Sequence, residues 1–197
     1  MRLDYRFFQK DAVPAARALL GKYLVRKIND QKIIVKIVDT EAYQGADDKA
    51  SHAYNNRKTK RTKTMFGRGG LAYIYLIYGM YYCFNIVTAA AEKPHAVLIR
   101  AVEPVAGLDL IKENRKIKSK KIEDLTNGPG KLSQALKIFK SLDGSDLVKS
   151  NKLYLIDSQN NNFKIEAAPR VNIDYAEEYR DKNWRFYIKG NKFISKS

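Results

Sequence analysis

The sequence predicts a single α+β domain built around an antiparallel sheet. The chain has 197 residues, of which 45% are hydrophobic, and it shows neither an internal repeat nor a linker-like segment, so one folded domain over residues 1–197 is expected. Strand-like segments follow one another in two blocks with helical segments between them, instead of alternating with helices one by one. This order is typical of an α+β fold in which neighbouring strands run antiparallel.

A first helix is expected directly after Asp11. Asp11 can cap the helix N-terminus, and Pro14 suits the first turn, where a backbone N–H is not needed. Gly21 can end the helix.

Two strands are expected next, at residues 23–28 and 32–43, joined by a short turn at Asn29 and Asp30. In the second strand, a period of two places alternate residues on one face. That face carries Ile33, Val35, Ile37, Asp39, Glu41 and Tyr43. The apolar face is therefore expected to end in carboxylates.

Residues 44–70 have no clear periodicity and are expected to form a long basic loop. The loop contains no acidic residue after Asp48. From position 57 on, its cationic residues are Arg57, Lys58, Lys60, Arg61, Lys63 and Arg68. They form either a solvated surface or a contact for a polyanion.

A tyrosine-rich hairpin is expected from two strand-like segments, 71–77 and 81–87, which flank Tyr78, Gly79 and Met80. Its tyrosines can pair within the sheet or form a stacking surface for bases, since each buried Tyr would need a partner for its O–H. Tyr78 lies at the predicted tip, where its ring would be exposed. Such a ring can act as a wedge in a base stack.

The rest of the chain continues the two-block pattern. One more strand precedes two amphipathic helices, and the last third returns to strands. These segments are the strand 96–104, the helices 106–117 and 129–140, and the strands 152–157, 163–171 and 184–195.

The composition favours a polyanionic partner. The formal net charge is +16 and the pI is near 9.8, which fits nucleic acid before an anionic membrane. No apolar run is long enough to cross a bilayer, and Asp4 and Asp11 interrupt any signal-like segment, so a cytoplasmic protein is expected, associated with the nucleoid if it is bacterial. Cys83 is the single cysteine, which excludes an intramolecular disulfide and a cysteine metal cluster.

Four polar residues are candidates for chemistry, each with a simpler alternative. Glu41 can activate water, or it can be a solvated charge at a strand end. His52 becomes relevant if its loop folds over Glu41, and Arg100 can serve the site or pair with Glu103. Asn85 lies between apolar strand neighbours, where its amide must find hydrogen-bond partners.

The segment NGPGKLS at residues 127–133 superficially resembles a phosphate-binding loop. Leu125 stands where that motif needs Gly, and Leu132 stands where it needs Ser or Thr. Lys131 in this segment is instead expected to contact DNA. The Lys-rich run at 112–121 has no assigned role.

Several motifs in this order resemble the alkyladenine type of 3-methyladenine DNA glycosylase. They are VDTEAYQGADDKASH, MFGRGGLAYIYLIYGMYYCFNIV, VLIRAVEP, NGPGKLSQAL and PRVNI followed by WRFYI, and the similarity runs from about residue 3 to about residue 190. The resemblance implies one compact domain with a curved antiparallel sheet flanked by helices, from which a β-hairpin protrudes into the DNA minor groove. It also implies a monofunctional hydrolase that flips damaged purines out of duplex DNA and leaves an abasic site.

The resemblance also assigns residues. Glu41 would activate the attacking water, with Arg100 and the backbone carbonyl of Val171 completing the water site. Tyr43, His52 and Tyr75 would sandwich the flipped purine, and Asn85 would crowd the 2-amino group of normal guanine. Tyr78, with Met80 beside it, would fill the gap in the duplex. The remaining DNA contacts are expected from Arg57, Lys58, Lys60, Arg61 and Lys131.

The expected substrates are 3-methyladenine and 7-methylguanine, with hypoxanthine as a further candidate. A monomer that uses neither a cofactor nor a metal is expected, with damaged double-stranded DNA as its partner. Two alternatives remain open. One is a non-enzymatic nucleic-acid-binding module with a tyrosine stacking platform. The other is a phosphodiester hydrolase with metal bound by Asp39, Glu41, Asp47 and Asp48.

Overall fold

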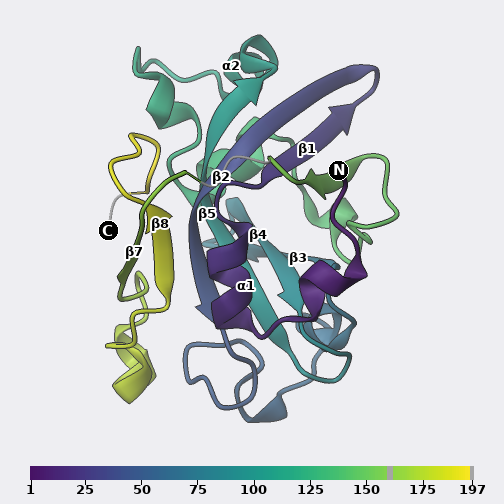
Figure 1. The fold of residues 1–197 in the computed structure, drawn as a ribbon, viewed down its shortest axis with the longest axis vertical. Coiled ribbons are helices and arrows are strands. Elements are labelled where there is room, and N and C mark those ends of the chain that lie inside the picture. The colour runs from purple at the N-terminus through teal and green to yellow at the C-terminus, as the bar shows by residue number, and fades with distance from the viewer. Residues whose placement is uncertain (159–161, 196–197) are drawn as a thin grey trace.

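The computed structural model describes residues 1–158 and 162–195 of the chain. Its strands form one open antiparallel sheet in the order β3-β4-β5-β2-β1-β6, and β8 and β7 continue from the second half of β2 (Figure 1). The α+β prediction is confirmed. The strands are β1 (Tyr23–Ile28), β2 (Gln31–Tyr43), β3 (Ala72–Ile77), β4 (Tyr81–Thr88), β5 (His95–Ala106), β6 (Leu153–Ile156), β7 (Ile165–Ala168) and β8 (Arg185–Ile188).

Short helices flank this sheet. α1 packs on β2, and α3 packs on β4 and α2, so that apolar side chains such as Leu19, Ile37, Phe84 and Leu132 share one buried core. The α-helices are α1 (Ala12–Leu19), α2 (Leu108–Arg115) and α3 (Pro129–Ala135). Turns of 3-10 helix lie at η1 (Tyr5–Gln9), η2 (Tyr54–Asn56), η3 (Lys63–Phe66), η4 (Ile122–Leu125), η5 (Lys140–Leu142) and η6 (Asp174–Tyr179).

A bulge in β2 changes which side of the strand faces the core. The register against β5 shifts between Ile37 and Asp39 and again between Asp39 and Thr40. Up to Ile37 the odd-numbered residues face the core, but from Val38 on the even-numbered residues do, as Val38 and Ala42 show. Thr40 lies on this same face, and its hydroxyl donates to Ala16 O in α1. The prediction that Asp39, Glu41 and Tyr43 continue the face of Ile33 is therefore wrong, because the bulge adds a residue and reverses the alternation.

The strands β3 and β4 pair in the register expected for a hairpin and join through Tyr78, Gly79 and Met80. Tyr78 and Gly79 both have positive φ, and the Met80 N–H donates to Ile77 O across the turn. Only glycine adopts this conformation freely, so the sequence at the turn is restricted. The Tyr78 side chain is 73% exposed.

The two later helices are shorter than the pattern predicts. α2 ends at Arg115 because Lys116 takes the left-handed conformation. α3 ends at Ala135, and the positive φ of Lys137 lets the Ile138 N–H donate to Ser133 O. Both helices end at backbone turns, and the spacing of apolar residues in the sequence does not predict where such turns occur.

The first helix begins where expected, but its predicted cap is wrong. The Asp11 side chain makes no hydrogen bond to the N-terminus of α1 and lies 3.3 Å from His95 Nδ1 instead. Across residues 1–158 and 162–195, no helix combines the length and the apolar character that a membrane span requires.

Candidate active site

One cavity brings together the side chains that the sequence predicts for catalysis and base binding. The cavity has a volume of about 600 Å³ and is lined by β2, β3, β4 and β5, by the loop at residues 44–70, and by residues after β7. Its lining includes Glu41, Tyr43, His52, Tyr75, Asn85, Arg100 and Val171. Residues as far apart in sequence as Glu41 and Val171 thus face one space.

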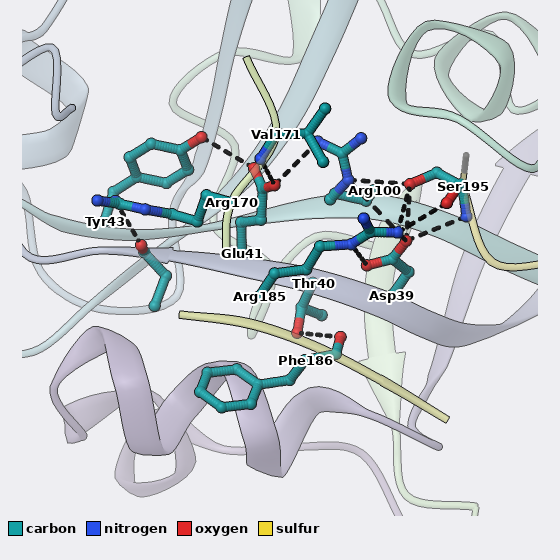
Figure 2. A network of polar contacts seen from close by, with 11 residues as sticks. Asp39, Thr40, Glu41, Tyr43, Arg100, Arg170, Val171, Arg185, Phe186 and Ser195 are labelled. Atoms are coloured by element: carbon teal, nitrogen blue, oxygen red, sulfur yellow. Dashed lines mark hydrogen bonds and ion pairs between the residues drawn. The ribbon is translucent and has the colours of Figure 1, made fainter. Parts of the chain in front are cut away.

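Three donors hold the Glu41 carboxylate. Its Oε1 accepts from the Val171 N–H at 2.7 Å and from Arg100 Nη1 at 3.1 Å, and its Oε2 accepts from the Tyr43 hydroxyl at 2.9 Å (Figure 2). Glu41 is fully buried, so the alternative of a solvated strand-end charge is wrong. A carboxylate has about four acceptor positions, which leaves Oε2 able to accept one more proton donor, such as a water.

Arg100 provides the positive charge nearest to Glu41. Burial by itself would lower the pKa of Arg100, but the charges of Glu41 and Asp39 outweigh burial and raise it. The guanidinium therefore stays charged. The alternative in which Arg100 pairs with Glu103 is wrong, because Glu103 pairs with Lys36 at 2.6 Å.

A buried ion pair fixes the segment that carries Val171. Arg170 donates to Asp48 at 2.6 and 2.8 Å from its two terminal nitrogens, and also to Ala42 O at 2.9 Å. Both side chains of the pair are completely buried. The pair anchors the chain next to β2, where the Val171 N–H can reach Glu41. The role predicted for the Val171 carbonyl stays a prediction.

Tyr43 is held as a hydrogen-bond donor. Burial, followed by the charge of Glu41, raises the pKa of Tyr43 well above its usual value. The Arg170 guanidinium lies 4.7 Å from the centre of the Tyr43 ring, which fixes the ring position. The phenol therefore stays protonated and donates to Glu41.

His52, Tyr73 and Tyr75 form an aromatic wall of the cavity. His52 Nδ1 lies 2.9 Å from the Tyr73 hydroxyl, and the rings of His52 and Tyr75 meet edge to face at 4.6 Å. Burial, and then the charge of Arg61, lower the pKa of His52 to about 4. The imidazole is therefore neutral at neutral pH.

Arg61 belongs to this wall, although the sequence suggested a phosphate contact for it. Its Nη2 lies 3.4 Å from His52 Nε2, and its guanidinium lies 5.0 Å from the centre of the Tyr75 ring. Because Arg can only donate, Nε2 acts as the acceptor, and Nδ1 carries the proton and donates to Tyr73. Arg61 therefore selects one tautomer of His52.

Asn85 is buried in the cavity wall with its amide fixed. Its Nδ2 donates to Tyr73 O at 3.2 Å and to Cys83 O at 3.4 Å. These are the partners that the sequence requires for an amide in an apolar strand. The amide is therefore satisfied and fixed in the cavity wall.

The residues predicted to contact DNA lie mostly outside the cavity. Tyr78 lines its edge, whereas Met80 is 66% exposed and is not part of the lining. Arg57, Lys58 and Lys60 are exposed on the loop, with Lys58 paired to Glu92 at 2.9 Å. Lys131 is half-buried and donates to Asn127 Oδ1 at 2.6 Å.

Sequence reasoning missed several residues that support the site. The sequence does not single out Tyr73, Arg170, Arg185 or Ser195 for the site. One signal was available for Arg185, which is a charged residue inside the strand-like segment RFYI. Such a residue must find a buried partner, but the sequence does not say which one.

The four carboxylates of the metal-dependent alternative are not gathered in one place. Asp39 pairs with Arg185 and Asp48 pairs with Arg170, while Glu41 is held by the donors described above. Within the described ranges, no three acidic, histidine or cysteine side chains are arranged to hold a metal ion. The ligand set of that alternative is therefore not assembled among the described residues.

Comparisons with known proteins identify the family of this chain. A family model described as methylpurine-DNA glycosylase matches residues 6–192. A relative from Natranaerobius thermophilus is 57% identical, with 99% of each chain covered. Relatives from Desulfitobacterium hafniense (48% identical, 98% of each chain) and Clostridium novyi (47%, covering 99% of this chain and 98% of the relative) also carry the name 3-methyladenine DNA glycosylase. This chain therefore belongs to the methylpurine-DNA glycosylase family of DNA repair hydrolases.

Proposed function

We propose that this protein excises 3-methyladenine and 7-methylguanine from duplex DNA by hydrolysing the N-glycosidic bond. It acts as a single domain over residues 1–197, as a monomer, and leaves an abasic site without cleaving the strand. The observation that carries the proposal is the Glu41 carboxylate, which three donors orient inside an aromatic cavity.

Glu41 activates the attacking water in this proposal. A water bound to Oε2 gives a proton to the carboxylate as its oxygen bonds to C1′ of the sugar, and the bond from C1′ to the purine breaks. The negative charge also stabilises the cationic sugar that develops in the transition state. Alkylation at N3 or N7 makes the purine a cationic leaving group, which departs as a neutral base without a general acid.

The aromatic side chains recognise the flipped base. Tyr43, His52 and Tyr75 line the cavity and offer faces and edges for stacking on a purine. The Asn85 side chain crowds the 2-amino group of guanine, which disfavours the normal base. 7-Methylguanine keeps that amino group, so its excision depends on its positive charge, which makes it the better leaving group. Hypoxanthine lacks that amino group and is the neutral candidate, although it needs a proton donor that alkylpurines do not need.

Tyr78 compensates for the loss of stacking in the duplex. Flipping a base costs a few kcal/mol, and least for damaged or mismatched pairs. An exposed ring at the end of the β3–β4 hairpin can enter the vacated stack, with Met80 beside it. The loop cations and Lys131 contact phosphates and hold the hairpin against the groove.

The decisive assay uses duplex DNA methylated by an alkylating agent and chromatography of the released bases. The wild type should release 3-methyladenine and 7-methylguanine, and no free purine at high enzyme concentration would refute the proposal. Glu41→Gln should keep DNA binding and lose base release. Glu166→Gln, in an exposed pair with Lys189, is the matched control and should retain full activity. Unchanged release by Glu41→Gln would remove Glu41 from the mechanism, and binding without any release by the wild type would favour a non-enzymatic module.

A further inference from the structure

A second buried network lies directly behind Arg100. Asp39 is fully buried, and its Oδ2 accepts from the Ser195 hydroxyl at 2.7 Å and from the Ser195 N–H at 3.0 Å. Arg185 at the start of β8 donates to both oxygens of Asp39, at 3.1 and 2.9 Å. Ser195 follows β8 in the chain, so the segment after the last strand brings Ser195 against Asp39, Arg100 and Arg185 (Figure 2).

Ser195 connects this network to Arg100. Arg100 Nε donates to Ser195 Oγ at 2.9 Å, and Arg185 Nη2 lies 3.3 Å from the same oxygen. Both guanidiniums are donors only, so the hydroxyl proton of Ser195 must point to Asp39, and its lone pairs must face the two arginines. The orientation of the hydroxyl is thus determined by the chemistry of its neighbours.

The opposite end of the Arg100 guanidinium reaches the reaction centre. Nη1 donates to Glu41 Oε1, so one planar group is fixed on one side by Ser195 and on the other side by Glu41. Two carboxylates, Asp39 and Glu41, face two guanidiniums, Arg100 and Arg185, and the buried charges balance. If Ser195 were lost, the Nε side of Arg100 would lack this acceptor, and Asp39 Oδ2 lies 3.9 Å from Nε, beyond hydrogen-bond distance.

We propose that Asp39, Ser195 and Arg185 are positioning residues, which hold the Arg100 guanidinium in the orientation that Glu41 needs for base excision. None of them lines the cavity, whereas Arg100 does, so they act through Arg100. The segment after β8 is then part of the catalytic apparatus and not only a cover for the sheet. This inference rests on the glycosylase activity proposed above.

The test is a double-mutant cycle on base release. Single-turnover rate constants are measured at saturating enzyme with a duplex containing 7-methylguanine, and the dissociation constant for the same duplex is measured separately. Ser195→Ala should lower the rate constant about 10- to 100-fold, because a small misplacement of a catalytic group has effects of this size, while the dissociation constant stays within about twofold. In an Arg100→Ala background, Ser195→Ala should cause no further loss, since its effect is transmitted through Arg100.

Two further variants separate positioning from general stability. Thr40→Val removes a buried hydroxyl on the same strand, which donates to Ala16 O at 3.0 Å and also lies 3.3 Å from Phe186 O. This hydroxyl does not contact Arg100, so the variant should lower the melting temperature with an unchanged rate constant. Ser195→Cys keeps the size of the side chain with a weaker acceptor, and it should give an intermediate rate even if Ser195→Ala does not fold.

The outcomes distinguish the two proposals. A wild type that releases no base overturns the proposed function and this inference together. A wild type that releases base while Ser195→Ala and Ser195→Cys match its rate constant overturns the positioning role alone. An additive loss in the Arg100→Ala background also overturns it, because Ser195 would then act independently of Arg100.

Discussion

The pair between Asp48 and Arg170 provides a stringent test of how this site is held together. Asp48 accepts four hydrogen bonds: two from Arg170, and one each from the N–H groups of Gln44 and Ala50 at 3.1 and 3.0 Å. Both side chains of the pair have an exposed fraction of 0%. Asp48→Asn keeps the shape but removes the charge and puts an amide donor against guanidinium donors.

The free energy of unfolding should fall by about 3–5 kcal/mol, because the change leaves a buried positive charge without its partner. That is a large part of the roughly 5–15 kcal/mol that stabilises a typical domain. Urea unfolding at neutral pH, followed by tryptophan fluorescence and circular dichroism, measures the difference. Base release should also decrease, since Arg170 anchors the segment from which Val171 donates to Glu41.

Asp181→Asn is the matched control. Asp181 pairs with Arg180 at 3.1 Å, but both side chains are more than half exposed, so no measurable loss of stability is expected. If Asp48→Asn cost no more than Asp181→Asn, the pair would not anchor the segment, and the argument from its burial would fail.

Three other predictions address the cavity, the hairpin and the core. The pKa of His52 is about 4 in the folded protein and 6.5 for an ordinary histidine, so the unfolded chain binds a proton first as the pH falls. The free energy of unfolding should therefore decrease between about pH 6.5 and pH 4, by at most about 3 kcal/mol. An NMR titration of His52 with a midpoint near 6.5 would contradict this prediction. Tyr78→Ser should weaken binding to a lesion-containing duplex more than to undamaged DNA, and equal losses in a fluorescence anisotropy titration would indicate a simple surface contact. Gly69→Ala should destabilise the fold by about 1–3 kcal/mol, because the added Cβ would lie 2.3 Å from the backbone oxygen of Phe8. Gly128→Ala is the control, since its Cβ would meet no atom closer than 3.7 Å. Equal melting temperatures of the two variants would refute the steric argument.

Local patterns were sufficient to locate the strands, although those expected at 163–171 and 184–195 extend only over Ile165–Ala168 and Arg185–Ile188. Alternating apolar residues predict β1, β2 and β5, and Gly79 between two strand-like segments predicts the β3–β4 turn, because these features depend on neighbours in the sequence. The motif VDTEAYQGADDKASH, through its resemblance, placed Glu41, Tyr43 and His52 together. The structure puts all three in one cavity.

The tertiary structure alone decided what each buried charge contacts. The bulge at Asp39 reversed the face of β2, and no residue type in that strand signals an extra residue in the ladder. Asp39 contacts Arg185 and Ser195 at sequence separations of 146 and 156 residues, and Asp48 contacts Arg170 at a separation of 122 residues. A sequence shows that a charge must be neutralised if it is buried, but the partner depends on which distant strands meet in the sheet. The sequence therefore determined the family and the location of the strands and indicated the residues of the cavity, and the tertiary structure determined how Glu41 and Arg100 are held in place.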